Sequence, residues 1–307
     1  MWGWRAALLA TAVVAMAIPA SASAATTGGD GKIAFSRLNP ATGHSSIFTV
    51  HPDGKGLRRL TSGEFDNGPA WSPNGRRIAF NRGVDIWVMD AWGHHLHQVT
   101  TSPAFEAEPA WSPDGKTLAF ISNRAGNGAW NVYTLHSTKP YGRAVAITHD
   151  VASHDGVCGL QGAQSPTYGP DGSLWWTDTC PSPDRDNTFT EILRLLPTET
   201  SPAVVATWTG LDIDVSPFGT ALLNTRISDA GTVAWIDRID LPGGQQTMIT
   251  PMFDNSGFPT WAPSGQRIAY TRLLPGTAHE QLVTANPDGT EIRPVIPNAG
   301  SPSWQPR

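Results

Sequence analysis

Cysteine and charge are both scarce in this chain of 307 residues. It contains 2 cysteines, and charged residues make up 15% of the sequence. A coiled coil and a disordered tail are excluded by this composition, and the length allows a core without disulfide staples. Basic residues are also the minority, with 21 Lys and Arg against 26 Asp and Glu and a net charge of −5. We therefore expect no nucleic-acid partner and no attraction to anionic lipid.

Glycine, proline and tryptophan are abundant instead. The chain has 31 Gly, 26 Pro and 13 Trp. Much glycine and proline suits many short strands joined by turns better than long helices. So many tryptophans indicate that a motif containing Trp has been copied along the chain. The length alone would allow one large domain or two ordinary ones.

The first residues resemble an export signal. Arg5 precedes an uncharged apolar run over Ala6–Ile18, which is followed by small residues and the Ala22-Ser23-Ala24 sequence. This layout is typical of a secretory signal peptide. The alternative, a membrane anchor, needs roughly 20 apolar residues. The sequence thus predicts a signal peptide over residues 1–24 and one domain over 25–307, secreted or periplasmic and not inserted in a membrane.

One short motif recurs along the chain. Clear copies lie at Pro69–Gly75, Pro109–Gly115 and Pro259–Gly265, and weaker copies surround Tyr168 and Val215. A truncated copy, Pro302–Pro306, ends the chain. We call the central position of each copy the Trp slot. It is occupied by Trp71, Trp111, Tyr168, Val215, Trp261 and Trp304, at spacings of 40, 57, 47, 46 and 43 residues.

The surroundings of each copy predict four short strands. The slot residue lies in the first strand, and the Pro and Gly that follow it bracket a tight turn. Second strands are predicted at Ile78–Phe80, Leu118–Phe120, Leu174–Trp176, Leu222–Leu223 and Ile268–Tyr270. Third strands are predicted at Asp85–Met89, Asn131–Leu135, Val233–Asp237 and Gln281–Val283. Fourth strands are predicted at Gln98–Thr100, Ala146–Thr148 and Met248–Thr250. Four antiparallel strands every 40-odd residues are typical of a propeller blade.

The two ends of the repeat region complement each other. The copy at Asp30–Phe35 lacks the Trp strand that should precede it, and the strand at Ser303–Pro306 has no blade of its own. Pairing these two strands would complete a sixth blade and remove the exposed sheet edges. The predicted fold is therefore all-β, a six-bladed β-propeller closed by its N- and C-terminal strands.

These phrases resemble the WD40-like repeat of the TolB propeller family, also called the PD40 repeat. The likeness rests on Pro-x-Trp-Ser-Pro-Asp-Gly, Ile-Ala-Phe and Asp-Ile-Trp-Val-Met-Asp, which end at Gly115, Phe80 and Asp90. It implies a six-bladed propeller, in a family whose best-known member is a periplasmic protein that binds other envelope proteins at the mouth of its channel. TolB itself carries an α/β domain before the propeller, and no such additional domain is expected here.

Polar residues gather just before each predicted innermost strand. Strand order places them on the face that also carries the longer, irregular loops, where binding residues are common. They are Asp66, Asn67, Glu106, Glu108, Gln164, Asp212, Asp254, Asn255 and Asn298. As a set they predict a partner-binding ring at the channel mouth. The alternative for each residue is hydrogen bonding within a turn. A Ca²⁺ ion could also bind such a ring, but no spacing specifies one and no cofactor is predicted.

Two smaller features concern disulfide and metal chemistry. Cys158, in the link before the blade around Tyr168, and Cys180, in that blade, fall on the same face, and an exported pair is usually oxidised. We predict a disulfide between them. His94, His95 and His97 form a local cluster, but zinc needs three or four ligands and no further ligand is suitably spaced. A solvated turn is the favoured interpretation.

The sequence favours a binding module over an enzyme. Related propellers precede the hydrolase domain of prolyl oligopeptidase-type peptidases, but no G-x-S-x-G nucleophile motif occurs here. We expect a non-catalytic propeller, monomeric, that binds an extracytoplasmic protein or peptide at its loop-rich channel mouth. The alternatives are a glycan- or small-ligand-binding propeller and a metal-dependent polysaccharide lyase.

Overall fold

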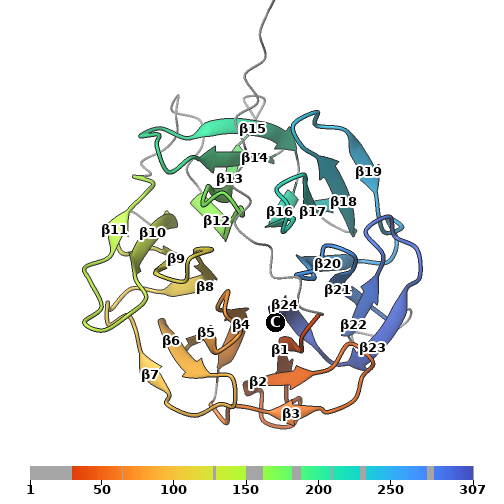
Figure 1. Ribbon diagram of the computed structural model, residues 1–307, viewed down its shortest axis with the longest axis horizontal. Coiled ribbons are helices and arrows are strands. Elements are labelled where there is room, and N and C mark those ends of the chain that lie inside the picture. The colour runs from red at the N-terminus through yellow and green to blue at the C-terminus, as the bar shows by residue number, and fades with distance from the viewer. Residues whose placement is uncertain are drawn as a thin grey trace, which may run out of the picture.

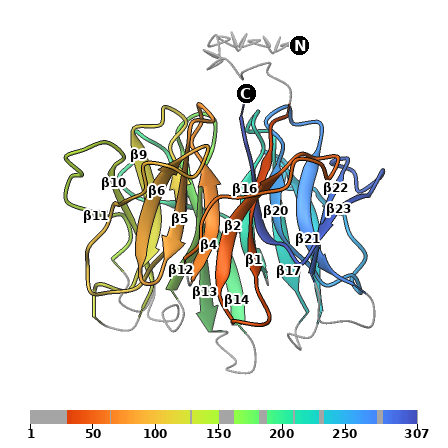
Figure 2. The same ribbon diagram turned by 90° about the horizontal axis from the view of Figure 1, so that it is seen from below.

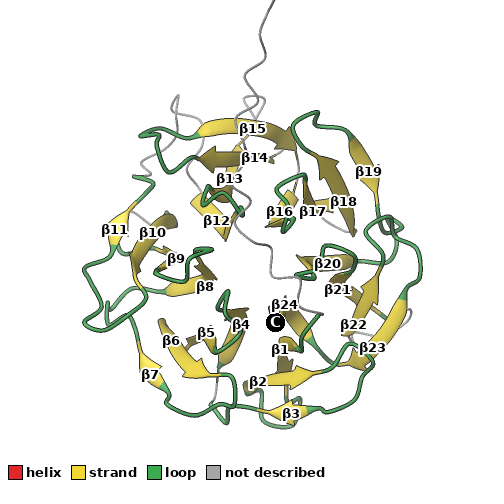
Figure 3. Cartoon of the chain, in the orientation of Figure 1, coloured by secondary structure: helices red, strands yellow, loops and turns green. Residues whose placement is uncertain are grey.

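The fold is an all-β ring. The computed structural model describes residues 30–63, 65–126, 129–149, 162–181, 188–208, 210–228, 233–274 and 280–306. These residues form six four-stranded antiparallel sheets and no helix. The sheets stand side by side around a central axis (Figure 1, Figure 2), and loops connect them throughout (Figure 3). The predicted six-bladed propeller is confirmed.

Each blade contains four strands in order from the axis outward. The first blade comprises β4 (Asp66–Trp71), β5 (Arg77–Arg82), β6 (Asp85–Asp90) and β7 (His97–Gln98). The second comprises β8 (Glu106–Trp111), β9 (Thr117–Ser122), β10 (Asn131–His136) and β11 (Val145–Ala146). The third comprises β12 (Gly162–Tyr168), β13 (Leu174–Pro181), β14 (Thr188–Leu195) and β15 (Ala203–Trp208). The fourth comprises β16 (Gly210–Val215), β17 (Ala221–Ile227), β18 (Ala234–Asp240) and β19 (Gln246–Met248).

The remaining two blades complete the ring. The fifth comprises β20 (Ser256–Trp261), β21 (Ile268–Leu273), β22 (Glu280–Ala285) and β23 (Arg293–Pro297). The sixth comprises β24 (Gly300–Trp304), β1 (Ile33–Leu38), β2 (Ser45–Val50) and β3 (Arg58–Arg59). The sixth blade thus takes its innermost strand from the C-terminal end of the described chain and the other three from the N-terminal end, as predicted.

The closing contact is a short antiparallel ladder. Ile33 lies opposite Trp304 and Ala34 opposite Ser303. Just beyond the strands, the Gln305 N–H donates to the Lys32 carbonyl at 2.8 Å. The ladder leaves no unpaired inner strand, so the blades form a closed ring.

Apolar side chains fill the spaces between neighbouring blades. The four slot tryptophans are buried, and Trp111 packs against Val88 of the first blade and Phe120 of its own. Successive side chains of a strand point to opposite faces of the sheet. The slot residue therefore points away from the axis, while the residue before it faces the channel. Trp111 also donates its indole N–H to the Ala70 carbonyl of the first blade at 3.0 Å. The slot tryptophans therefore join neighbouring blades.

The bounds of the fourth strands differ from prediction by one or two residues. The first blade's outer strand ends at Gln98, before the predicted Val99 and Thr100. Val99 packs in the core, and the Thr100 hydroxyl accepts the Ile86 N–H at 2.9 Å. Equivalent hydroxyl contacts satisfy the N–H groups of Ile47, Val132 and Ile236, through Thr61, Thr148 and Thr250. An apolar residue followed by Thr thus marks the end of the outer strand.

The signal peptide prediction falls on residues 1–24, which lie outside the described residues. The described part of the chain contains no helix with the length and apolar character needed to cross a membrane.

We expect deletion of Ser301–Arg307 to lower the melting temperature by about 10 °C or more. The deletion removes Trp304 and the ladder to β1, and loss of one buried Trp side chain alone costs about 3–5 kcal/mol. Differential scanning calorimetry of the full and shortened chains measures the effect. A shortened chain as stable as the full one would show that closure does not hold the ring together.

Candidate functional site

The central channel is shaped by a bulge in every innermost strand. In all six blades the register between the first and second strands shifts about three residues before the Trp slot. The residues three before each slot are Gly68, Glu108, Ser165, Asp212, Phe258 and Ser301, which we call the bulge ring. Five of them have positive φ, between 48° and 55°, Asp212 being the exception. A β-bulge re-aims side chains, and here it turns them toward the channel.

Strain at these positions supports a functional role for the ring. Glycine adopts positive φ freely, but only the first blade has glycine there. A left-handed conformation costs a non-glycine residue about 1–2 kcal/mol. Glu108, Ser165, Phe258 and Ser301 all adopt it. Strain of this kind is common at ligand sites.

The bulge ring borders a cavity of about 620 Å³ along the axis. All six innermost strands line it, together with the prolines two residues after each slot: Pro73, Pro113, Pro170, Pro217, Pro263 and Pro306. Its acidic lining residues are Glu108, Asp212 and Asp214, and its described lining includes no Lys, Arg or His. The cavity therefore has a negative wall without a positive counterpart.

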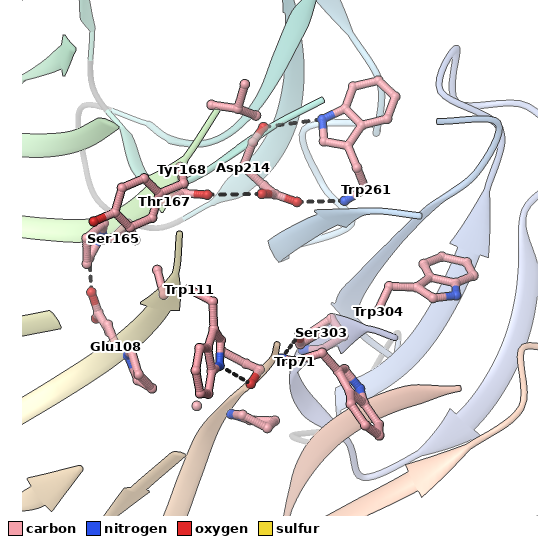
Figure 4. A pocket seen from close by; sticks show the side chains of 18 of the residues that line it. Trp71, Glu108, Trp111, Ser165, Thr167, Tyr168, Asp214, Trp261, Ser303 and Trp304 are labelled. Atoms are coloured by element: carbon pink, nitrogen blue, oxygen red, sulfur yellow. Dashed lines mark hydrogen bonds between the residues drawn. The ribbon is translucent and has the colours of Figure 1, made fainter. Parts of the chain in front are cut away.

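Glu108 links the second blade to the third. Its carboxylate accepts the Ser165 N–H at 2.6 Å (Figure 4), and its own N–H donates to the Asn81 side chain at 3.2 Å. Burial and, to a smaller extent, the nearby Asp212 carboxylate outweigh the effect of the Ser165 bond and raise the pKa of Glu108 to about 7. This carboxyl group therefore titrates near neutral pH.

Two aspartates continue the acidic wall on the fourth blade. Asp214 accepts the Trp261 N–H at 2.7 Å and the Thr167 hydroxyl at 3.3 Å, and burial raises its pKa to about 6 (Figure 4). Asp212 accepts the Ser165 hydroxyl at 3.3 Å, and burial raises its pKa as well. Together with Glu108, these groups place negative charge on the side of the channel formed by β8, β12 and β16.

The opposite side of the channel is uncharged. There Phe258 is exposed on the bulge ring, and Ser301 and Ser303 contribute hydroxyls. The Ser303 hydroxyl also accepts the Trp71 N–H at 3.1 Å and so joins the sixth blade to the first (Figure 4). An occupant would meet carboxylates on one side and an aromatic ring with hydroxyls on the other.

The structure brings three of the nine predicted site residues to this cavity. They are Asn67, Glu108 and Asp212. The other six, Asp66, Glu106, Gln164, Asp254, Asn255 and Asn298, are not among its lining residues. Their roles in partner binding stay predictions.

Asp66 and Glu106 are buried and take part in ion pairs within their own blades. Asp66 accepts two bonds from Arg82, at 2.7 and 2.8 Å, and Glu106 pairs with Arg124. The Arg82 guanidinium also lies over the Phe80 ring, 5.4 Å from its centroid. Bidentate Arg–carboxylate pairs are geometrically specific and strong. We call this arrangement of acid, arginine and ring the arginine clamp.

Related contacts hold the links of other blades. Arg272 lies 3.7 Å from Asp254. Arg37 donates to the Asn298 carbonyl at 3.0 Å and lies over the Phe48 ring. Arginines at the end of second strands thus recurrently fasten the chain that leads into an innermost strand.

The remaining predicted residues hydrogen-bond to residues on other strands. The Asn255 side chain accepts the Ala234 N–H at 3.0 Å, and the Asn298 N–H donates to the Glu280 carbonyl at 2.6 Å. The Gln164 carbonyl accepts the Thr177 hydroxyl at 3.2 Å. These contacts reach other strands and differ from the hydrogen bonds within a turn that were considered as the alternative.

Sequence reasoning missed Ser165, Asp214 and Phe258. Each can be found only by counting back from the Trp slot. The residue three before the slot and the residue one before it are those that face the channel. A search for polar residues near the start of a predicted strand finds these channel-facing residues together with buried ones. Asp66, which lies two residues before the bulge ring, is an example of a buried one.

Disulfide and metal predictions are not resolved by the described residues. Cys158 lies outside them, so the disulfide with Cys180 stays a prediction. Within the described ranges no group of three His, Cys, Asp or Glu side chains is placed to hold a metal ion. His95 lies 2.9 Å from Asp90, and both His94 and His95 are exposed.

Replacement of Asp66 should weaken the fold. In Asp66→Ala the Arg82 guanidinium loses its bidentate partner while it remains mostly buried. We expect a loss of roughly 2–4 kcal/mol in unfolding free energy, near the range for a broken buried pair. Urea denaturation measures it. An Asp53→Ala variant, at an exposed turn, serves as the control, and equal effects of both substitutions would contradict the clamp.

The raised pKa of Glu108 makes stability depend on pH. Its pKa rises from 4.5 to about 7 on folding, so wild type loses stability as the pH increases through that interval. Glu108→Gln lacks this titration. We expect the variant to gain about 1–3 kcal/mol over wild type at pH 8 and little at pH 4, since each pKa unit corresponds to about 1.4 kcal/mol. Denaturant unfolding at both pH values, with exposed Glu199→Gln as control, tests it; a pH-independent difference would contradict the assignment.

Comparison with known proteins agrees with this architecture. The family described as the TolB beta propeller domain, PD40, matches residues 69–156. The chain is similar to the Tol-Pal system protein TolB of Rhizorhabdus wittichii, with 38% identity over 65 residues, which are 19% of this chain and 15% of that protein. The matched part is therefore a small share of that relative.

Two solved structures share the fold. TolB from Acinetobacter baumannii superposes with a TM-score of 0.72 and 21% identity, over 90% of this chain and 67% of that one. Hydrazine synthase from Kuenenia stuttgartiensis gives 0.71 and 14% identity, over 90% of this chain and 47% of that one. Such different proteins on one scaffold show that fold alone does not give function. By its fold and its repeat, the chain is a TolB-like six-bladed β-propeller.

Proposed function

We propose that the protein is a non-catalytic binding module outside the cytoplasm, and that it holds a segment of a protein or peptide partner in its central channel. The observation that carries this proposal is the acidic wall of Glu108, Asp212 and Asp214 in a cavity whose described lining has no basic residue. A segment with a Lys or Arg side chain would supply the missing charge. Charge complementarity of this kind selects partners and orients them.

The loop-rich face supports entry from that end of the channel. The bulge ring lies nearer this end of the channel than the six lining prolines do. The links that lead to β4, β8 and β20 carry the exposed side chains Phe65, Phe105 and Phe253. Aromatic residues are enriched in protein–protein interfaces, where they anchor partners. The rim would thus pack against apolar parts of the partner while a basic side chain reaches the carboxylates.

The location outside the cytoplasm rests on two observations. One is the signal peptide predicted over residues 1–24. The other is the likeness to a protein of the Tol-Pal system. A glycan or small-molecule ligand and polysaccharide lyase activity stay the alternatives, and neither requires a basic group in the occupant.

Selection of peptides from a displayed random library tests the function. The library is panned against the purified chain at pH 7.5 in low salt, and an enriched peptide is titrated by calorimetry. We expect enriched peptides to contain Lys or Arg, and Glu108→Gln/Asp212→Asn to weaken binding at least tenfold. The control Asp53→Asn/Asp288→Asn removes two exposed carboxylates on turns at the opposite face and should bind within twofold of wild type.

The pH dependence of the same titration gives a second readout. A cationic group binds the ionised carboxylates, whose pKa values reach about 7 for Glu108 and about 6 for Asp214. Affinity should therefore rise from pH 5 to pH 7.5 and fall with added salt. The proposal would be contradicted if the enriched peptides were neutral and bound equally well to the two double variants.

A further inference from the structure

An aromatic residue follows the acidic side of the channel in the bulge ring. Phe258 on β20 lies next to Asp212 of the neighbouring blade, and its N–H donates to the Asp212 carboxylate. The Phe258 side chain lines the cavity and is 42% exposed, although phenylalanine is ordinarily buried. The cavity therefore offers an occupant a carboxylate and an aromatic ring on adjacent inner strands.

Hydrogen bonds connect these two residues to Glu108. Ser165 donates its hydroxyl to Asp212 at 3.3 Å and its N–H to Glu108 Oε2 at 2.6 Å. Glu108, Ser165, Asp212 and Phe258, which are neighbours around the bulge ring, are thus joined in a row. Glu108 Oε1 accepts no hydrogen bond from the described residues. An occupant that donates hydrogen bonds finds a free acceptor at one end of this row and an aromatic ring at the other.

The chain itself places arginine where a carboxylate lies beside a ring. The arginine clamps are one example, and Arg226 is another: it lies 3.4 Å from Asp237 and 5.4 Å from the centroid of the Trp235 ring. Every cation–π contact among the described residues comes from an arginine. The ion pairs of Lys55 and Lys116, by contrast, are formed with aspartates that are 57% exposed.

The chemistry of the two cations explains this division. A guanidinium group is planar and stacks on aromatic rings, while its fork of N–H groups donates to carboxylates. It is also less strongly hydrated than the ammonium group of lysine, so it loses less hydration free energy on entering a cavity. A site that combines carboxylates with a ring therefore favours arginine.

We propose that the basic side chain bound by the channel is an arginine, whose guanidinium stacks on the Phe258 ring and donates to Asp212 and Glu108. This inference rests on the proposed function, in which a segment of a basic partner enters the channel. It makes Phe258 a specificity-determining residue, because the carboxylates attract any cation and the ring distinguishes arginine from lysine.

Competitive panning of three displayed heptapeptide libraries tests the inference. The libraries have random flanks and a fixed central Arg, Lys or Gln, and they are mixed in equal amounts over the immobilised full chain at pH 7.5 in low salt. On wild type we expect the Arg library to be enriched about tenfold or more over the Lys library. Both should be enriched over the Gln library, because both carry the charge that the carboxylates attract.

Phe258→Leu removes the ring and keeps an apolar side chain of similar size. We expect the variant to enrich the Arg and Lys libraries about equally, within about threefold, since only the stacking contact is lost. Its continued enrichment of both over the Gln library shows that the variant is folded. The matched control is Phe218→Leu on the turn after β16, where the phenylalanine is 56% exposed and is not a lining residue of the cavity. The control should keep the wild-type preference for Arg.

The possible results separate this inference from the function on which it rests. Equal enrichment of the Arg and Lys libraries on wild type would overturn the arginine assignment and leave a basic partner in place. A preference for Arg that Phe258→Leu retains would overturn the role of the ring. Failure of both basic libraries to exceed the Gln library would overturn the proposed function, and the inference with it.

Discussion

Closure of the ring is the constraint on which the rest of this structure depends. Six blades meet around one axis, so each innermost strand has a blade on either side and only its channel side left open. The pairing of β24 with β1 completes this arrangement, and the slot tryptophans fill the spaces between blades. A cavity at the axis exists because the ring is closed. Its lining is set by which residues of the six inner strands face inward.

The channel lining opposes stability. Glu108 combines a left-handed backbone with a buried carboxyl group whose pKa is raised to about 7. Asp214 is also buried, with a pKa of about 6. Both carboxylates also accept a backbone N–H of a neighbouring blade, from Ser165 and Trp261, and so join blades as the slot tryptophans do. By contrast, the acids in arginine clamps, such as Asp66, have their charge compensated within the blade. The two kinds of acid therefore differ in their surroundings: the acids of the clamps are paired with arginine, whereas the channel carboxylates have no basic residue among the described lining of the cavity.

The fold could be predicted well from the sequence because the residues of the repeat have strong local conformational preferences. Pro and Gly mark the turn after each slot, and alternating apolar residues mark the second and third strands. The outer strands were placed too far along the chain, because a Thr hydroxyl such as that of Thr100 replaces the ladder there.

The channel site was predicted only in part. Asn67, Glu108 and Asp212 line the cavity, but Asp66 and Glu106 belong to clamps, and Asp214 was missed. A bulge shifts the alternation by one residue, so polarity near a strand start does not tell which side chains face the axis. Partners such as Arg82 are distant in sequence, which hides the clamps from a local pattern.

The pKa of the Glu108 carboxyl group tests the central claim most directly, because that claim is an acidic channel wall without a counter-charge. Carbon NMR of the labelled side chain can follow its titration in the free protein and with a Lys-containing peptide bound. We predict a value near 7 in the free protein, and a lower value once a cationic group lies beside the carboxylate. A free-protein pKa near the ordinary 4.5, or a value that the bound peptide leaves unchanged, would contradict the account.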